Sequence, residues 1–392
     1  MKRANVFLLG IVSFLNDLSS EMIMPILPMF ITASGGTGLV VGLIGGLREG
    51  ITSLLNVFSG YWSDKTRKRK IFVRSGYLIS SISKLLLSFS SIWQHILIFS
   101  GIERVGKGLR TPARDAIIAD SMPKELGKGF GIHRALDTSG AILGAGVVFV
   151  LFWFLRLNFR SIIFIAAILS FLSLIPLRFV TERRGKPQDR TLNVGIKDLP
   201  VSIRWFILIA GIFGLANFSY MFFILKAQEL FTGRSSVGMP IILYTLFNVF
   251  YGLFAAPFGV LSDKIGRGKV IISGYLLFSL TSLGFALSNS LPVFIVLFVL
   301  YGLVHAMIDG NQRAFISELS SEELKATVLG AFHTTVGLVA LPASLIAGFL
   351  WHTVAPTATF VYGGFVGVIP VVLFLRFRDR FKERSDVMPV VP

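Results

Sequence analysis

The chain carries the hexapeptide Gly60-Tyr61-Trp62-Ser63-Asp64-Lys65, and a second copy of its pattern, Gly259-Val260-Leu261-Ser262-Asp263-Lys264, follows about half a chain length later. Two further echoes also lie close to half a chain length apart, since Asp120 is matched by Glu318 and His133 by His333. One echo can arise by chance, whereas several in one register indicate an internal repeat. The sequence therefore predicts two halves of similar build, with a hexapeptide at the same place in each.

Apolar segments of membrane-spanning length surround both hexapeptides. Of the 392 residues, 53% are hydrophobic and 15% are charged, against roughly 25% charged residues in soluble chains. A spanning helix needs about 20 largely apolar residues. Segments of that kind lie near residues 5–32, 38–62, 71–92, 95–121, 128–155, 160–178, 202–230, 236–262, 269–288, 291–318, 326–352 and 356–377.

These segments predict an all-α integral membrane protein with twelve transmembrane helices. The longest polar stretch lies near the middle of the chain and has the composition of a linker. We therefore expect an N-terminal six-helix bundle at 1–180, a cytoplasmic linker at 181–200, a C-terminal six-helix bundle at 201–378 and a cytoplasmic tail at 379–392.

The formal net charge of +17 would suggest a nucleic-acid partner if the protein were soluble. Here the basic residues gather on alternate connections between apolar segments, near residues 65–70, 124–128, 178–190, 264–269, 325 and 376–384. Basic connections of membrane proteins stay in the cytoplasm. We expect both termini to be cytoplasmic, a location in the inner membrane of a bacterium or archaeon, and no nucleic-acid partner.

The two hexapeptides resemble the loop signature of the major facilitator superfamily, Gly-x-x-x-Asp-Arg/Lys-x-Gly-Arg/Lys-Arg/Lys, which in that family joins helices 2 and 3 and again helices 8 and 9. The first copy keeps Gly60, Asp64, Lys65, Lys68 and Arg69 but has Arg67 at the second glycine, and the second copy matches through Gly259, Asp263, Lys264, Gly266 and Arg267. The resemblance implies the fold of prokaryotic twelve-helix transporters, with two pseudo-symmetric halves and alternating access around a central site. It also implies that the loop residues latch the halves on the cytoplasmic side.

Ionisable side chains at membrane depth are costly unless they are paired or line a wet cavity, and most of them lie in the first half. For the residues near the middle of their spans we expect a polar cavity. Its candidates for proton coupling are Asp17, Glu21, Glu49, Glu103 and Arg104, and its candidates for substrate binding are Arg48, Lys107 and Arg110. Arg104 with Gly108 also resembles the helix 4 arginine motif that the superfamily associates with proton coupling.

An ion-pair network that only holds helices together is the alternative for these charges. We expect that structural role for the four residues nearer the cytoplasmic end, Arg114, Asp115, Arg134 and Asp137. The second half has fewer ionisable side chains at membrane depth. Its candidates for hydrogen bonding to a substrate are Asn217, Tyr244, Asn248, His305 and Asp309. By the resemblance, spans 3, 6, 9 and 12 face lipid and the other eight line the site.

Taken together, these features predict a secondary active transporter that exports a small solute in exchange for protons. Mid-membrane basic residues favour a substrate that is anionic or a metal chelate. Export is favoured by Gly140 and Gly144, which match part of an exporter pattern, Gly-x-x-x-Gly-Pro, without its proline. The alternatives are a proton symporter or uniporter for uptake, an exporter of lipophilic drugs, and a membrane scaffold or sensor.

Other chemistry is not expected. The chain has no phosphate-binding Gly-x-x-x-x-Gly-Lys-Ser/Thr loop and no cysteine, and its intramembrane histidines are scattered. We therefore predict no enzymatic activity, no cofactor and no metal site. The expected partners are a small-molecule substrate, protons and membrane lipid, with the protein itself a monomer.

Overall fold

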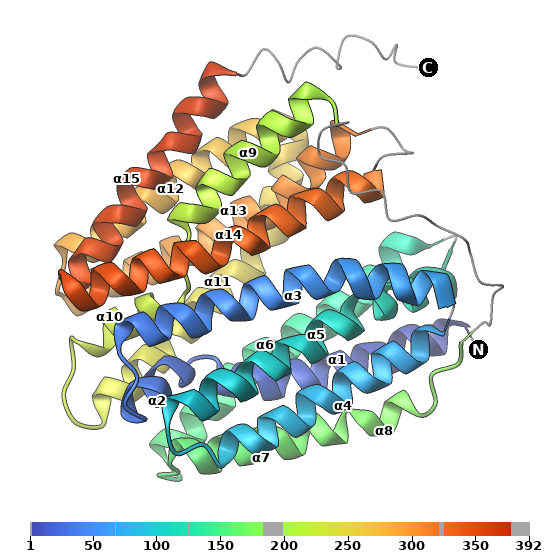
Figure 1. The fold of residues 1–392 in the computed structure, drawn as a ribbon, viewed down its shortest axis with the longest axis horizontal. Coiled ribbons are helices and arrows are strands. Elements are labelled where there is room, and N and C mark those ends of the chain that lie inside the picture. The colour runs from blue at the N-terminus through green and yellow to red at the C-terminus, as the bar shows by residue number, and fades with distance from the viewer. Residues whose placement is uncertain (1, 67, 124, 183–198, 321–324, 378–392) are drawn as a thin grey trace. The chain divides into compact units, whose positions relative to one another are not determined.

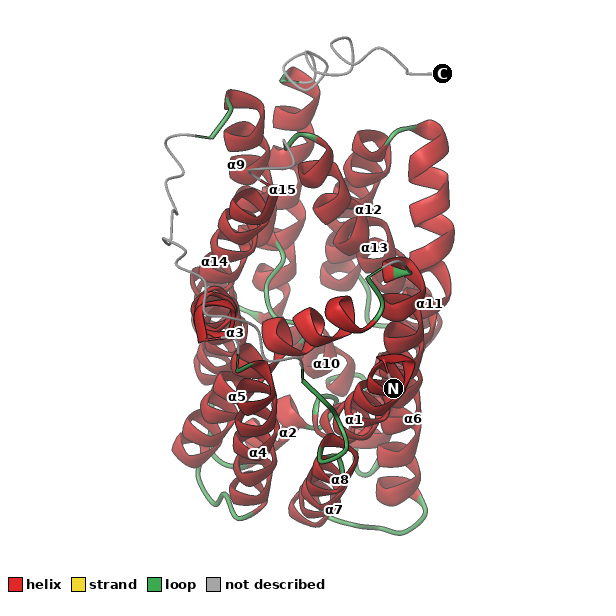
Figure 2. Ribbon diagram, turned by 90° about the vertical axis from the view of Figure 1, so that its right-hand side faces the viewer, coloured by secondary structure: helices red, strands yellow, loops and turns green. Residues whose placement is uncertain are grey.

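The computed structural model describes residues 2–66, 68–123, 125–182, 199–320 and 325–377, and every regular element among them is a helix (Figure 2). By their contacts the described residues form two compact units. Unit 1 comprises residues 1–192 with 220–245, and unit 2 comprises 193–219 with 246–392. Arg67, linker residues 183–198 and the tail from 379 onward lie outside the described residues, so the predicted domain boundaries stay a prediction.

Unit 1 contains the first six spans, two of which are broken into shorter helices. Its elements are α1 (Lys2–Ile23), α2 (Leu27–Ala33), α3 (Gly38–Thr66), α4 (Arg69–Ser88), α5 (Trp93–Ser121), α6 (Leu126–Trp153), α7 (Phe159–Leu172), α8 (Leu174–Leu177) and α10 (Met221–Gln228). Helix α11 (Ser235–Ile265) begins in unit 1 and ends in unit 2. The remaining elements of unit 2 are α9 (Val201–Ala216), α12 (Arg267–Leu287), α13 (Leu291–Glu318), α14 (Lys325–Thr353) and α15 (Pro356–Arg376).

The same spans pair in both units. In unit 1, α1 packs on α6 and α7, and α4 packs on α5 and α7. In unit 2 the corresponding helices repeat this, with α9 on α14 and α15, and α12 on α13 and α15 (Figure 1). The repeated pairing confirms the predicted fold of two pseudo-symmetric six-helix halves.

Eleven helices among the described residues are long and apolar enough to cross a membrane. Helix α5 makes the twelfth span. It equals α3 in length, at 29 residues, but carries too many charged side chains to qualify by hydropathy. A span of this length can be polar only if neighbouring helices shield its charges from lipid. Helix α5 packs against both α3 and α4, which lie on either side of it in Figure 1.

Three spans are interrupted, at α1–α2, α7–α8 and α9–α10. Helix α1 ends at Ile23 and α2 begins at Leu27, because Pro25 and Pro28 lack the N–H groups that a continuous helix needs. From the sequence alone, these two prolines predict a distortion of the outer end of the first span, and the structure confirms it. The break between α9 and α10 was not predicted, since no proline or glycine marks it. There Asn217 donates its N–H to the carbonyl of Phe213 (2.9 Å), and Ser219 donates its N–H to the hydroxyl of Ser344 (3.2 Å).

Glycines set the distance between α1 and α6. A Cβ atom at Gly140 would overlap the backbone carbonyl of Phe14, and one at Gly144 would overlap that of Leu18. Small residues one turn apart allow two membrane helices to approach backbone to backbone. These two glycines therefore serve close packing, whatever their relation to the exporter pattern.

Candidate functional site

Three charged side chains from α3 and α5 meet inside unit 1. The carboxylate Oε2 of Glu103 lies 3.5 Å from Arg48 Nη2 and 3.4 Å from Arg104 Nε. All three residues are at most 6% exposed. Arg104 Nη2 also lies 3.7 Å from Oε1 of Glu49, whose side chain is mostly exposed. Buried charges persist only where opposite charges offset their lost hydration. We call Arg48, Glu103 and Arg104 the arginine cluster.

The arginine cluster leaves hydrogen-bonding capacity unused. Arg48 Nε, Arg104 Nε and Glu103 Oε2 are buried and make no hydrogen bond within the described part of the chain. The ion-pair distances to Glu103 therefore reflect charge attraction without hydrogen-bond geometry. A guanidinium group is a planar fork of donors that suits carboxylate and phosphate groups. The cluster can thus accept an anionic group from a ligand.

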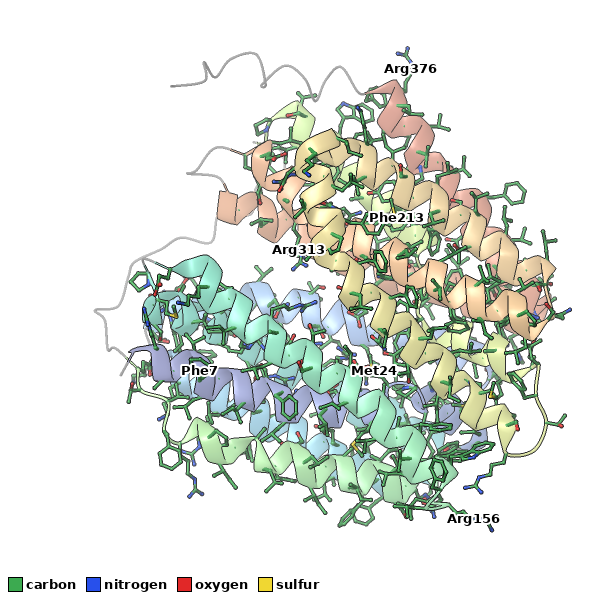
Figure 3. All side chains as sticks on the ribbon, turned by 180° about the vertical axis from the view of Figure 1, so that it is seen from behind. Phe7, Met24, Arg156, Phe213, Arg313 and Arg376 are labelled. Carbon is green, nitrogen blue, oxygen red and sulfur yellow. The ribbon has the colours of Figure 1, made fainter. Side chains whose placement is uncertain are left out.

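Both arginines also reach the sulfur of Met24. Its Sδ lies 3.3 Å from Arg48 Nη2 and 3.7 Å from Arg104 Nη2. Thioether sulfur is a weak acceptor. Met24 sits in the α1–α2 break (Figure 3), where Pro28 cannot donate to its carbonyl as a helix would. The hydroxyl of Tyr220 donates to that carbonyl instead, at 3.3 Å. The proline-induced break thus places Met24 beside the cluster, where its sulfur is a weak acceptor and its carbonyl accepts from Tyr220.

A pair of carboxyl groups lies elsewhere in unit 1, between α1 and α6. The side chains of Asp17 and Asp137 come within hydrogen-bonding reach of each other. Asp137 also pairs with Arg134 at 3.3 Å, and Asp17 accepts a hydrogen bond from the amide of Asn16 at 3.3 Å. A hydrogen bond between two carboxyl groups requires a proton, because a carboxylate has no donor. The pair is therefore a natural place for a transferable proton.

Lys84 is a site residue that the sequence analysis missed, because it lies on α4, a span expected to face lipid. Its side chain is 1% exposed. The ammonium group donates to Ser19 Oγ (3.0 Å), Ser20 Oγ (2.9 Å) and the carbonyl of Asn16 (3.3 Å). These oxygens use its three donors without a carboxylate. Lys84 thereby fixes Asn16, the neighbour of Asp17. A lone lysine in an otherwise apolar span was the available signal.

The other candidates of the first half have separate partners. Glu21 accepts a hydrogen bond from the hydroxyl of Tyr244, at 2.9 Å. Arg110 is buried, donates to Ser80 Oγ at 2.5 Å, and stacks over Tyr77 with its guanidinium carbon 4.5 Å from the ring centre. Lys107 is half-buried and interacts electrostatically with Arg104, Asp17 and Glu49. The charge of Lys107 therefore interacts with both the carboxyl pair and the arginine cluster.

The four residues assigned a structural role form two local pairs rather than one group in contact. Arg114 lies 2.9 Å from Asp115, its neighbour in sequence, and Arg134 pairs with Asp137. Arg114 also donates to the hydroxyl of Ser13, at 3.0 Å. Asp137 is set apart from the others, because it alone reaches the carboxyl group of Asp17.

The candidates of unit 2 lie on different helices. His305 Nδ1 is 3.4 Å from Asp309 Oδ2 on α13, and Asp309 also accepts a hydrogen bond from Tyr251. The rings of Phe247, Tyr251 and Tyr301 surround the imidazole, with centroids 4.9–6.0 Å away. Asn217 lies in the α9–α10 break and Asn248 on α11. Among the described residues, no group of three or more potential ligand side chains could hold a metal ion.

The two loop motifs build matching ion triads. Arg69 pairs with Asp64 (3.1 Å) and with Asp120 (2.5 Å). In the second loop, Arg267 pairs with Asp263 (2.9 Å) and with Glu318 (2.8 Å). Each triad thus joins its motif aspartate to the carboxylate at the end of the fourth span of its own half. Lys65 contacts Tyr61, at 3.5 Å, within its own helix. Within the described ranges no ion pair is observed for Lys264.

The second loop also shows why its motif contains a glycine. Gly266, directly before α12, has a φ of 97°, which side-chain-bearing residues rarely adopt. The other motif glycines are helical. A Cβ atom at Gly60 would meet Pro112 at an ordinary 3.5 Å, and one at Gly259 would meet nothing within 4 Å. Only Gly266 is therefore required by its own backbone.

Known proteins with the same architecture are transporters. The Major Facilitator Superfamily model matches residues 9–232 and 205–388. The chain is 55% identical over 375 residues to an uncharacterized MFS-type transporter of Methanocaldococcus jannaschii, covering 95% of this chain and 94% of that protein. It is 24% identical over 394 residues to the quinolone resistance protein NorA of Staphylococcus aureus, covering 97% and 99% of the two chains.

Solved structures agree on the fold. A variant of the nucleoside transporter NupG superposes with a TM-score of 0.80 at 14% identity, covering 95% of this chain and 99% of that one. A POT family transporter superposes with a TM-score of 0.79 at 15% identity, covering 96% of each chain. With its twelve spans, its repeated loop triads and a family match over both halves, the chain belongs to the major facilitator superfamily of membrane transporters.

Proposed function

We propose that this transporter exports a small organic solute with an anionic group in exchange for protons. The observation that carries the proposal is that unit 1 contains both an anion acceptor with unused donors and a carboxyl pair that can hold a proton. The acceptor is the arginine cluster, and the pair is Asp17 with Asp137. Lys107 interacts with both and gives them an electrostatic link.

Binding of the anionic group is supported by the unused N–H donors of Arg48 and Arg104. A carboxylate or phosphate oxygen is a far stronger acceptor than the sulfur of Met24. Its negative charge would also offset positive charge in the cluster, because the buried Glu103 balances only one of the two arginines and Glu49, the other carboxylate near Arg104, is mostly exposed. The substrate would therefore satisfy groups that the protein leaves unsatisfied.

Exchange for a proton is supported by the carboxyl pair. A positive group on the solute would compete with the shared proton for Asp17 and Asp137, because the pair can neutralise one positive charge at a time. A solute with both an anionic group and a basic amine would therefore bind as the proton leaves. Quinolones with an amine substituent have this chemistry, and the likeness to a quinolone resistance protein favours export.

The orientation that export requires is supported by the charge pattern. Basic residues cluster on alternate connections, including those at both ion triads. We therefore propose that the ends carrying Arg69 and Arg267 face the cytoplasm, together with both termini, in the inner membrane of a prokaryote.

The test is solute accumulation in proteoliposomes under an imposed pH gradient, with a labelled quinolone that carries a carboxylate and an amine. The wild-type protein should accumulate the solute only when protons can flow the opposite way. Asp17→Asn should abolish this accumulation yet retain solute exchange without a gradient. Glu125→Gln, which removes a carboxylate from the surface pair with Arg3, should behave as wild type. Undiminished accumulation by Asp17→Asn would refute the role of the carboxyl pair.

Proton symport is the second candidate, and the same arginine cluster favours it if the solute is a plain anion. An anion without an amine would bind better when the carboxyl pair keeps its proton, since the proton removes a nearby negative charge. Anion and proton would then move together. The same assay distinguishes the two candidates. Symport, and not antiport, would be the mechanism if a simple carboxylate accumulates in the direction of proton flow and the amine-bearing quinolone does not accumulate against it.

A further inference from the structure

A groove of about 500 Å³ lies between α4 and α8, away from the arginine cluster and the carboxyl pair. It is lined by three basic and three apolar side chains: Lys70, Arg74, Leu78, Leu174, Leu177 and Arg178. Nothing in the transport proposal uses it. We propose that this groove binds one anionic phospholipid of the surrounding membrane, with the phosphate on the basic residues and an acyl chain along the leucines.

The order of residues along α4 matches the order of groups in a phospholipid. Lys70 lies in the first turn, Arg74 follows one turn later and Leu78 another turn later. At 1.5 Å per residue, each step moves about 6 Å along the helix. On the other wall, Arg178 stands at the end of α8, with Leu177 and Leu174 before it. Both walls thus change from basic at the helix end to apolar towards the membrane interior.

The positive charges of the groove are not neutralised by the described part of the chain. Among those residues no ion pair is observed for Lys70, Arg74 or Arg178, whereas nearby Arg69 pairs with Asp64 and Asp120. Lys70 donates to the carbonyls of Arg178 (3.0 Å) and Val180 (2.5 Å), which anchors α8 to α4 and leaves its charge unbalanced. A basic pocket between spans at the cytoplasmic side is the setting in which anionic lipid headgroups bind.

Basic residues at a helix end also arise from the rule that orients membrane proteins, but the repeat separates the two explanations. Helix α12 is the counterpart of α4, and the two loop motifs align Lys68 with Arg267. In the same alignment Lys70 corresponds to Lys269, but Arg74 corresponds to Ser273. Orientation of the protein in the membrane requires basic residues in both loops, whereas a single lipid-binding site requires an additional basic residue, Arg74, in only one half. The second basic turn, together with leucines beside it, therefore points to a ligand.

The lipid should also meet an apolar surface outside the groove. Leu78 is 39% exposed, and Ile71 and Ile175 on the same two helices are more than half exposed. Leu177, by contrast, is buried at the floor. An acyl chain leaving the groove would thus remain in contact with apolar side chains. A free phosphate ion would gain nothing from the leucines, which is why we assign the site to a lipid.

The test is native mass spectrometry of the delipidated full-length protein, titrated with phosphatidylglycerol or with phosphatidylcholine. The wild-type protein should bind one phosphatidylglycerol more tightly than any phosphatidylcholine. Arg74→Gln/Arg178→Gln should weaken that binding about 25-fold, which is what two interfacial charges of about 1 kcal/mol each supply. Leu78→Ser should weaken binding of long-chain more than of short-chain phosphatidylglycerol.

The matched control is Arg156→Gln/Arg376→Gln. It removes the same charge from two exposed arginines that project from separate helix ends (Figure 3). This variant should bind phosphatidylglycerol as wild type does. Equal binding by the groove variant, equal affinity of the wild type for both lipids, or full competition by inorganic phosphate would each overturn the proposal.

Discussion

The two units pair their spans alike but bury different side chains. Unit 1 encloses charges, with Arg48, Glu103, Arg104 and Lys84 all buried. In unit 2, no charged side chain is buried among the residues described there, and aromatic rings fill the space. Phe285, for example, lies 5.0–5.6 Å from the rings of Phe294, Phe298 and Phe360.

This difference in buried side chains indicates which unit can respond to protons and ionic ligands. Aromatic rings pack without needing particular partners and add about 0.5–1.5 kcal/mol per pair beyond their burial. Buried charges need partners, and their free energy changes sharply whenever a proton or an ionic ligand arrives. The same helix pairing thus encloses a set of charged side chains in unit 1 and clustered aromatic rings in unit 2.

The largest effect should come from removing the shared anion of the arginine cluster. Glu103→Ala leaves Arg48 buried without its counter-charge and Arg104 with only the mostly exposed Glu49, so we expect a loss of ~3–5 kcal/mol in unfolding free energy. Thermal and denaturant unfolding in detergent would measure it. The matched change in unit 2 is Asp309→Ala, whose side chain is 37% exposed, and it should cost only about 1 kcal/mol. Equal losses would show that the interior of unit 1 is hydrated, and the comparison would fail.

A smaller difference should separate the two ion triads. Arg69 is 10% exposed in its side chain and Arg267 23%, and the partners Asp263 and Glu318 are both more than half exposed. Hydrogen bonds to charged groups contribute most when water is excluded, so Arg69→Ala should cost roughly 2 kcal/mol. For Arg267→Ala we expect less than about 1 kcal/mol. Raising the salt concentration should reduce the second loss more than the first, and the reverse order would contradict this ranking.

The smallest effect concerns the glycines of the second loop. Gly266→Ala forces a side chain into positive φ and should cost about 1 kcal/mol. Gly259→Ala is its control, because that glycine is helical with open space around it, and alanine should leave stability unchanged or raise it by roughly 0.5–1 kcal/mol. Unfolding of both variants beside the wild type would measure the difference. If both lose stability equally, Gly259 is needed for a helix contact after all.

Much of the fold was predictable because the signals for it are local. The lengths of the apolar segments predicted the spans, Pro25 and Pro28 predicted the α1–α2 break, and the matching residues of the two halves predicted the two-fold repeat. The structure confirmed all three. Asp120 and Glu318 were recognised as echoes, and the structure adds that each closes an ion triad with its own loop. The α9–α10 break was not predictable, because it depends on Ser344, far along the chain, as a hydrogen-bond partner.

The sequence by itself determined that this chain crosses a membrane with twelve helices in two related halves, because hydropathy and repeats are read along the chain. It also showed that charges concentrate in the first half. Only the tertiary structure decided how they combine: Glu103 between two arginines, Asp17 against Asp137, and Lys84 beside Asn16. The physical reason is that pairing at membrane depth depends on distances of a few ångströms between different helices, which residue types do not reveal. The basic groove at α4 and α8 likewise exists only because folding brings the two helix ends together.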